Sequence, residues 1–305
     1  MITVIGSANQ DIIMQLSHLP LPGETVGEGL LSYANGGKGA NQAVAASRTG
    51  CSVSLIAALG SDKTGETMLS SFMDEHINTE AVSLLNGHNT GTAFILVNRE
   101  GENCIAVAPG ANSHLQPQHI EAAHSLVSKS SWGLMQCEIS SETQLAVIRL
   151  LKDLSIPLIL NYAPFREPGI ALSSGITGLV VNELEAGELL SSPISNVEQA
   201  RESAGVLYRL GPKWVIITLG SDGVVLADDT GIHHFPGFKI TPVDTTASGD
   251  AFCGVLAAGL DKGMSLHQAI ERAQAAGALT ATKIGAQPSL PYQSQIDHFI
   301  TSTRR

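Results

Sequence analysis

The chain has 305 residues, of which 43% are hydrophobic and 15% charged, so it is long and apolar enough to bury a sizeable core and is not a disordered protein. Its formal net charge of −11 has the opposite sign to that of most nucleic-acid binders, so DNA and RNA are not expected partners. The sequence shows no basic leader segment and no apolar run of the roughly 18 residues that a membrane span needs. With four widely separated cysteines, it is predicted to be cytoplasmic, reduced and away from membranes.

The predicted elements alternate between buried strands and amphipathic helices along most of the chain. In chain order, strands are expected at 2–5, 53–59, 132–137, 157–160, 178–181 and 215–219. Helices are expected from near Asn41, then at 66–76, 142–154, through Glu185 and Leu189, and at 197–210 and 251–260. This alternation predicts an α/β protein whose parallel sheet is covered by helices on both faces.

Two regions interrupt the alternation, at about 11–36 and about 90–110. They hold short strand-like runs, at 12–16, 93–97 and 105–107, with turn residues such as Pro22-Gly23 between them. We interpret these regions as a small β-sheet inserted into the α/β body. Because no repeat, low-complexity tract or long linker is visible, residues 1–305 are expected to form a single domain.

The segment DTTASGDAFCG, residues 244–254, joins a turn of small residues to a predicted helix. Such a turn points several backbone N–H groups at one spot, which suits a phosphate or a developing negative charge. Asp250, beside this spot, could accept a proton from a substrate hydroxyl. On spacing alone, an Asp that simply stabilises the helix dipole is the more ordinary interpretation.

The segment NGGKGANQ, residues 35–42, has glycines that allow a close approach of the backbone to a ligand. Lys38 and Asn41 add donors for oxygen-rich groups. The segment lacks the G-x-x-x-x-G-K-[ST] pattern, which excludes a Walker-type phosphate loop. Taken alone, it is equally well explained as a tight turn that opens a helix.

Polar residues also follow two of the predicted strands. Asn9 and Asp11 follow the first strand and could present an amide and a carboxylate to hydroxyl groups, although an Asx-turn explains them equally well. Asn182 and Glu185 follow the strand at 178–181, at the edge where open α/β sheets bind ligands, and their oxygens could hold Mg²⁺ through water. No G-x-G-x-x-G pattern marks the first turn, which argues against a dinucleotide site.

The ten histidines indicate no metal site. His114, His119 and His124 are spaced by five, which does not place them on one helical face. His233 and His234 have no cysteine or acid at ligand spacing. We therefore expect all of the histidines to be ordinary surface or loop residues.

Taken together, the segments closely resemble the ribokinase branch of the PfkB carbohydrate kinase family. The similarity runs nearly from end to end, and several motifs in the same order are far more specific than any one of them. The matching segments are Gly6-Ser7 with Asn9 and Asp11, 22–25, 36–43, Met135-Gln136 with Glu138, Asn182-Glu183 with Glu185, 218–221, Asp244-Thr245 with Gly249-Asp250, and 285–289.

The resemblance implies a three-layer α/β/α sandwich with a small β-sheet lid that closes over a sugar. It also implies ATP-dependent transfer of a phosphoryl group to a primary hydroxyl, here the 5-hydroxyl of D-ribose, which gives D-ribose 5-phosphate. Within the same class, a kinase for deoxyribose or for another furanose or nucleoside stays open. From another class, a sugar-binding regulator without catalysis is an alternative, against which the intact Gly249 and Asp250 argue.

The resemblance further assigns roles to individual residues. Asp250 is the catalytic base, and the amides around Ala247, Ser248 and Gly249 form the anion hole. The residues implied to contact the sugar are Asn9, Asp11, Gly37, Lys38, Asn41 and Glu138. Those implied on the nucleotide and Mg²⁺ side are Asn182, Glu185, Thr218, Gly220, Ser221, Gly223 and Gly249.

The family also often uses K⁺ beside the anion hole and often dimerises through its lids, so we expect a K⁺ activator and a homodimer. The positions that match the K⁺ site are Asp244, Thr246, Thr280, Lys283, Gly285 and Ser289. Two positions depart from the branch. Ser248 stands where the branch tends to have Ala and keeps its backbone N–H, and Tyr162 stands where it tends to have Pro, next to the expected pocket.

Overall fold

The computed structural model describes residues 1–165 and 174–303. Within these ranges the strands form a nine-stranded sheet, in the order β13-β12-β11-β10-β9-β8-β1-β4-β5, and a four-stranded sheet, in the order β3-β2-β6-β7. The strands of the large sheet are β1 (Ile2–Ile5), β4 (Val53–Gly60), β5 (Val82–Leu85), β8 (Trp132–Gln136), β9 (Leu158–Asn161), β10 (Gly178–Asn182), β11 (Trp214–Thr218), β12 (Val224–Asp228) and β13 (Gly231–Phe235). Those of the small sheet are β2 (Asn9–Gln15), β3 (Leu30–Gly36), β6 (Gly91–Val97) and β7 (Asn103–Ala108).

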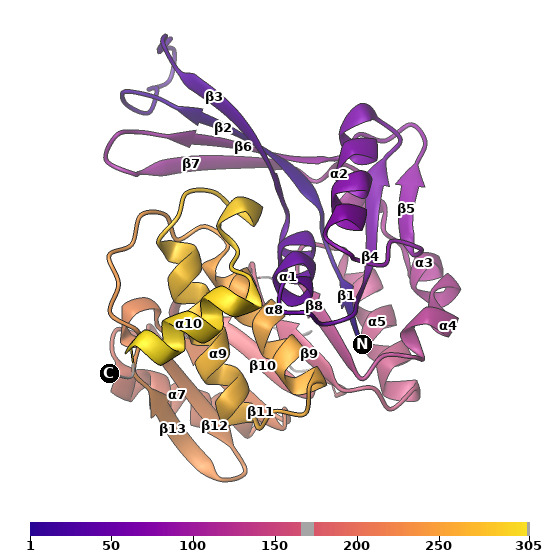
Figure 1. Cartoon of the computed structure of the whole chain (residues 1–305), viewed down its shortest axis with the longest axis vertical. Coiled ribbons are helices and arrows are strands. Elements are labelled where there is room, and N and C mark those ends of the chain that lie inside the picture. Colours follow the sequence, from indigo (N-terminus) through magenta and orange to yellow (C-terminus); the bar gives the residue numbers. More distant parts are fainter. Residues whose placement is uncertain (166–173, 304–305) are drawn as a thin grey trace.

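Helices cover both faces of the large sheet, so the predicted α/β sandwich is confirmed (Figure 1). The α-helices are α1 (Lys38–Ser47), α2 (Lys63–Asp74), α3 (Pro117–Ala122), α4 (His124–Val127), α5 (Ser141–Asp153), α6 (Glu183–Leu190), α7 (Val197–Tyr208), α8 (Ser248–Asp261), α9 (Leu266–Ala281) and α10 (Gln293–Thr303). Short 3₁₀ turns are η1 (Gly110–His114), η2 (Gly220–Asp222) and η3 (Gln287–Ser289).

The alternation of side chains along each strand divides the core into two layers. On one face, Val4 and Leu55 pack with apolar residues of α1, α2, α8, α9 and α10. On the other face, Ile5 and Ile56 pack with residues of α3, α5, α6 and α7. Because both faces are covered, the central strands are largely apolar, and this is why the sequence shows them as continuous hydrophobic runs.

The large sheet is mixed, and the prediction of a wholly parallel sheet is wrong at one edge. β4, β1, β8, β9, β10 and β11 are parallel, but β12 runs antiparallel to β11, and β13 antiparallel to β12. This edge is a hairpin with a short turn at residues 229–230, which needs no crossover helix.

The small sheet projects from one end of the body as a lid (Figure 1). Only three residues separate its strand β2 from β1, so the chain passes directly from the body into the lid. Asn9 and Asp11 therefore lie on the lid strand, at its junction with the body. The glycine-rich segment that follows β3 brings the chain back to the body as α1, which begins at Lys38 rather than near Asn41.

Candidate active site

The carboxylate of Asp250 is at the centre of the site. It lies in the first turn of α8, is 6% exposed, and accepts hydrogen bonds from Asn41 Nδ2 and Gln42 Nε2, both at 2.9 Å. Burial raises the pKa of Asp250, while the nearby Lys38 ammonium opposes the rise. The chain thus holds a carboxylate of fixed orientation and raised proton affinity, which suits a general base.

The helix that carries Asp250 begins three residues earlier than the sequence predicted. Ala247 caps it in the left-handed conformation, with φ of 61°, so Ser248, Gly249 and Asp250 already belong to the first turn. The first N–H groups of a helix have no partner inside the helix, although that of Ser248 donates to the carbonyl oxygen of Thr245 at 3.2 Å. This places the predicted anion hole at the positive end of the α8 dipole, beside the carboxylate.

Gln42 was not among the predicted site residues, yet it fixes the base. Its amide nitrogen bonds both Asp250 and Asn161 Oδ1, and its carbonyl oxygen accepts from Gln136 Nε2 at 2.6 Å. Gln42 is completely buried in this network. The sequence indicated a role for Gln42 only through its position next to Asn41, in the motif that opens the helix.

The lid contributes Asn9 and Asp11. Asn112, from the 3₁₀ turn η1 behind the lid, donates to Asn9 Oδ1 at 2.7 Å and bonds both backbone groups of Ala8. This second missed residue fixes the start of β2. Asp11 is 7% exposed, and burial, with added repulsion from Glu138 and Asp250, raises its pKa to about 7.

The turn before α1 approaches the lid backbone closely. Gly37 has φ of 87°, and a Cβ built on it would lie 2.7 Å from the backbone nitrogen of Asn9. A Cβ on Gly36 would lie 2.2 Å from Asp11 Oδ2. Gly36 is therefore required by the packing of β3 against Asp11 within the lid, and Gly37 by the close approach of the turn before α1 to the start of β2.

Glu138 joins the turn to the body. Its Oε2 atom accepts a hydrogen bond from the backbone N–H of Lys38 at 3.1 Å and another from the hydroxyl of Ser7. Burial disfavours the charged form of Lys38, but the carboxylates of Asp250, Glu138 and Glu185 outweigh it and raise the pKa of Lys38. The ammonium thus stays charged among the acids that surround it.

A cavity of about 610 Å³ opens beside the N-terminus of α8. Five predicted nucleotide-side residues, Thr218, Gly220, Ser221, Gly223 and Gly249, line it together with Ser248. The remaining wall comes from Val224, Gly237, Phe238, Lys239, Ile240, Pro242, Thr245, Phe252 and the α9 residues Gln274, Gly277, Ala278 and Ala281. The structure therefore brings these predicted residues to one cavity that ends at the predicted anion hole.

Asn182 and Glu185 do not line this cavity; they cap α6. The side chain of Asn182 accepts from the Glu185 backbone N–H at 2.8 Å, and the Glu185 carboxylate accepts from the Asn182 N–H at 2.9 Å. Burial raises the pKa of Glu185, and Lys38 opposes that rise. The carboxylate therefore lies within electrostatic range of the Lys38 ammonium, which also acts on Asp250.

Three of the six predicted K⁺-site residues meet directly. Asp244 accepts from the backbone N–H of Thr246 at 2.9 Å and of Gly285 at 2.8 Å. These bonds outweigh burial and lower the pKa of Asp244. Thr280 and Lys283 belong to the turn before Gly285, joined by a backbone bond of 3.1 Å, whereas the hydroxyl of Ser289 bonds Ala286.

Three buried polar atoms at the site have no hydrogen-bond partner among the residues that the structure describes. They are Oδ1 of Asn41, whose other amide atom holds Asp250, Oγ of Ser248, in the first turn of α8, and Oε1 of Gln136, whose amide nitrogen bonds Gln42. Buried polar atoms are normally paired, so Asn41 Oδ1 and Ser248 Oγ, on predicted site residues, point to a ligand that supplies the partner. Asn41 Oδ1 accepts only, which fits a ligand hydroxyl.

Two expectations about single residues change with the structure. Tyr162 is completely buried in the core layer that holds Ile139 and Leu160, and its ring lies edge-on to Phe165. It lines neither the cavity of about 610 Å³ nor a second cavity of about 270 Å³. His233 does have an acidic neighbour, because the β12–β13 hairpin places its Nε2 3.7 Å from Asp228 Oδ1. Spacing along the chain concealed this pair, since the hairpin turn lies between them.

Comparison with known proteins identifies the family of the chain. The family model described as pfkB family carbohydrate kinase matches residues 1–293. The chain belongs to the PfkB family. Relatives at this level include ribokinases of Haemophilus influenzae, 36% identical with 98% of each chain covered, and of Staphylococcus aureus, 32% identical with 97% of this chain and 98% of the relative covered.

Solved PfkB-family structures show the same fold. Arabidopsis thaliana ribokinase complexed with ribose and ATP matches with a TM-score of 0.90, 27% identity and 98% of each chain covered. Within the described ranges, no helix is both long and apolar enough to cross a bilayer.

Proposed function

We propose that this PfkB-family chain is an ATP-dependent ribokinase, which transfers the γ-phosphoryl group of ATP to the 5-hydroxyl of D-ribose. The observation that carries the proposal is the buried carboxylate of Asp250, held by two amides at the positive end of α8. Ribokinase relatives that match over nearly the whole chain, one of them complexed with ribose and ATP, support the choice of substrates.

The reaction requires positioning more than strong base chemistry. Phosphoryl transfer has a loose transition state whose negative charge is spread over the equatorial oxygens. Asp250 accepts the proton of the attacking hydroxyl, and the N–H groups of residues 247–249 stabilise the charge that develops on the transferred group. The Asn41 and Gln42 amides hold Asp250 in one orientation, so no reorganisation is needed during the step.

The sugar would lie between the lid and the turn before α1. Asp11 and Asn41 Oδ1 are acceptors for its hydroxyl groups, and Asn9, Gly37, Lys38 and Glu138 surround the same space by family resemblance. Lys38 also offsets the repulsion among the carboxylates. Since Asp11 is on the lid and Asn41 on the body, one sugar would hold the two parts together.

ATP would occupy the cavity of about 610 Å³, with its triphosphate toward Ser248 and Gly249. The carboxylate and amide oxygens of Glu185 and Asn182 fit Mg²⁺, which prefers hard oxygen ligands and keeps much of its water. When bound, the ion would neutralise phosphate charge. In a chain of net charge −11, such neutralisation is needed for a triphosphate to bind.

A K⁺ ion would bind where Asp244 ties the loop before α8 to Gly285. Carbonyl oxygens of this loop and of the turn at 280–285 are suitable donors, with Thr246, Thr280, Lys283 and Ser289 at the matching positions. K⁺ should raise the rate by ordering the loop ahead of the anion hole. Equal rates in K⁺ and in tetramethylammonium, at fixed Mg²⁺, would contradict this part of the proposal.

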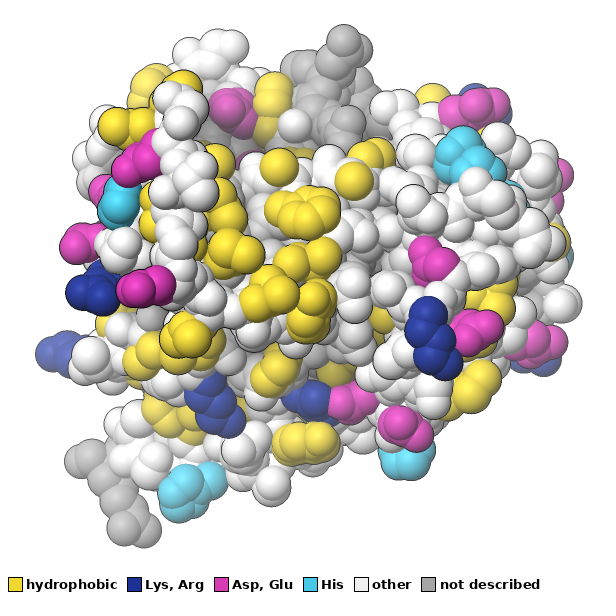
Figure 2. Space-filling model, turned by 90° about the horizontal axis from the view of Figure 1, so that it is seen from above, with side chains coloured by type: hydrophobic (Ala, Val, Ile, Leu, Met, Phe, Trp, Pro, Cys, Tyr) yellow, Lys and Arg dark blue, Asp and Glu magenta, His cyan; other side chains and the backbone are white. Residues whose placement is uncertain are grey.

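The outer face of the lid supports a homodimer. Strand register places Tyr33, Ile12, Phe94 and Ala106 in one row, and Leu31, Met14, Leu96 and Cys104 in the next, on the face opposite Asp11. Figure 2 shows hydrophobic side chains gathered on the face of the molecule seen from above, where the lid lies. A patch of this kind, with open strand edges, marks a protein contact, and we assign it to a second copy.

Light scattering tests the dimer. Phe94→Lys, on the lid, should reduce the mass to that of a monomer. Leu210→Lys, at an exposed apolar residue of the body, is the matched control and should leave the mass unchanged. A monomeric parental chain would refute the lid contact.

Sugar-dependent ADP formation tests the reaction itself, with D-ribose, 2-deoxy-D-ribose, a hexose and a nucleoside as acceptors. D-ribose should be the best acceptor, and ³¹P NMR should place the phosphate on O5. A nucleoside or deoxyribose as the better acceptor would refute the ribose assignment but keep the kinase. Binding of ATP without turnover on any acceptor would indicate a sugar-binding regulator.

A further inference from the structure

Two histidines and an aspartate meet at the edge of the body, outside the catalytic site. Asp228 ends β12, His233 lies on β13 across the hairpin turn, and His267 is in the first turn of α9. Their ligand atoms all lie within 4.8 Å of one another. His233 Nε2 is 3.7 Å from Asp228 Oδ1, and His267 Nε2 is 3.9 Å from Asp228 Oδ2.

These separations are close to those of a tetrahedral zinc site. Zinc bonds of about 2.0–2.2 Å to imidazole nitrogen and carboxylate oxygen place neighbouring ligand atoms about 3.4 Å apart. The two histidine–aspartate pairs would therefore need to approach by about 0.3–0.5 Å, while the two imidazole nitrogens lie within 4.8 Å of each other. Two imidazoles and one carboxylate form a donor set that binds zinc-class ions and leaves a coordination position for water.

The surroundings orient the three ligands. The backbone N–H and the hydroxyl of Thr230 donate to Asp228 Oδ1 at 2.9 and 2.6 Å, which fixes the carboxylate with its other oxygen toward His267. The His267 ring packs edge-on against His233 and Phe235, with centroids 4.9 and 5.2 Å away. Such supporting contacts are typical of ligands in metal sites.

A purely structural explanation accounts for only part of this arrangement. The Thr230 hydroxyl also contacts His233 Nε2 at 2.8 Å, so it could serve simply to bridge the hairpin turn. His267 takes no part in that turn, yet its Nε2 faces the free oxygen of Asp228. With 47% of its side chain exposed, against 11% for Asp228, it also leaves the cluster open for an ion to enter.

We propose that Asp228, His233 and His267 form a binding site for a divalent transition-metal ion of the zinc class. The ion would cross-link the β12–β13 hairpin to the start of α9. Seven residues further along α9, Gln274 donates to the carbonyl oxygen of Phe235 at 3.1 Å and lines the large cavity. Metal binding therefore stabilises the edge of the body that forms one wall of that cavity.

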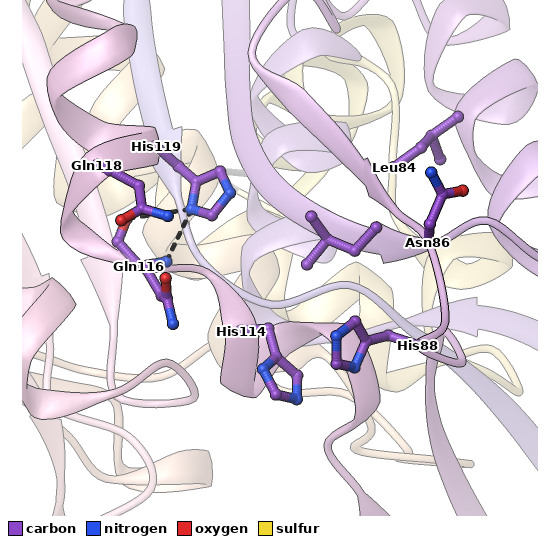
Figure 3. A pocket seen from close by; sticks show the side chains of 8 residues that line it. Leu84, Asn86, His88, His114, Gln116, Gln118 and His119 are labelled. Carbon is purple, nitrogen blue, oxygen red and sulfur yellow. Dashed lines mark hydrogen bonds between the residues drawn. The ribbon is translucent and has the colours of Figure 1, made fainter.

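Another group of histidines must be separated from this site in any test. His88 and His114 stack with ring centroids 3.8 Å apart in a cavity of about 270 Å³, and His119 across it is bonded to Gln116 (Figure 3). Among the described residues, the Asp228 cluster is the one group in which three metal-ligating side chains come within 4.8 Å. The His88 cavity could at most add a weaker, two-histidine site.

The test is a titration of the EDTA-treated full chain with Zn²⁺, followed by calorimetry, in a His88→Gln/His114→Gln background. One tight site is expected. His233→Gln and His267→Gln should each weaken it about 100-fold or more, since even outer contacts of metal ligands contribute 10–100-fold. His234→Gln is the matched control, because His234 points to the opposite face of β13 and bonds Asp222 instead.

Co²⁺ gives an independent readout. Bound to the parental chain, it should show the intense visible absorption of a four-coordinate ion, and this band should disappear in His267→Gln but stay in His234→Gln. Circular dichroism will show that each variant is folded. The proposal is overturned if Zn²⁺ binds equally well to His233→Gln and His267→Gln, if His234→Gln weakens it as much, or if the parental chain shows no tight site.

Discussion

Ionisation of Asp11 should make the native state less stable as the pH rises, and Asp11→Asn should remove this dependence. The carboxyl is almost fully buried beside Glu138 and Asp250, and its pKa rises from 3.8 to about 7. At about 1.4 kcal/mol per pKa unit, this rise sets an upper limit of about 4 kcal/mol on the unfolding free energy that is lost when Asp11 ionises. The asparagine keeps the size of the side chain but carries no charge.

The direction follows from proton linkage. Because the pKa is higher in the folded state than in the unfolded state, the folded chain binds the proton more tightly, and it is most stable below pH 3.8 with respect to this group. That contribution is lost progressively as the pH rises to about 7 and is gone above it. Between pH 5 and pH 8 the parental chain should lose about 2–3 kcal/mol that Asp11→Asn does not lose.

Urea unfolding of both chains at pH 5 and pH 8 measures this difference directly. The advantage of Asp11→Asn in unfolding free energy should be larger at pH 8 by about that amount, while carboxylates remote from Asp11 titrate equally in both chains and cancel. Asp153→Asn, at an exposed position on α5, is the control and should show no such change. If the Asp11→Asn difference is the same at both pH values, the burial argument for Asp11 is refuted.

Three further predictions concern the site. Asp250→Asn should lower kcat by about 10²–10⁴-fold with little change in the Kd of ribose, and near-parental turnover would exclude Asp250 as the base. The kcat/KM for D-ribose should exceed that for 2-deoxyribose about 10-fold or more, because the deoxy sugar lacks a hydroxyl and leaves a buried polar group of the site unpaired. Asp11→Ala should reduce this ratio. In urea unfolding, Gly37→Ala should destabilise the chain by about 2 kcal/mol, because Gly37 combines a positive φ with a close approach to the Asn9 backbone. The control Gly27→Ala, at a position that faces open space, should not destabilise it, and equal effects of the two variants would contradict the packing argument.

The fold was predictable where the sequence shows a continuous or periodic pattern of buried apolar residues. The strands at 2–5 and 178–181 and the helix at 197–210 were recognisable because both faces of the sheet are covered. The β12–β13 hairpin was missed, because the outer strand is half exposed and carries His233 and His234 rather than an apolar run. The start of α8 was misplaced because Ala247, which does not usually adopt a positive φ, caps the helix.

The site was predictable only as separate pieces. Asn41 and Asp250 are 209 positions apart, so no local pattern could show that the amide bonds the carboxylate. Family resemblance named both residues but not their contact. Gln42 and Asn112, which hold the base and the lid strand, have no chemistry that distinguishes them in a sequence from other buried amides.

The walls of the large cavity have a consequence for the choice of phosphoryl donor. Away from the anion hole, much of its wall is apolar, from Val224, Ile240, Phe252 and Ala278. The side-chain nitrogen of Gln274 is already bonded to the carbonyl oxygens of Phe235 and Pro236. Contacts to a nucleobase would thus be made mainly to its ring faces. Apolar contact of this kind discriminates poorly between purines that differ only in their edge groups. We therefore expect the chain to discriminate little among purine nucleoside triphosphates as phosphoryl donors.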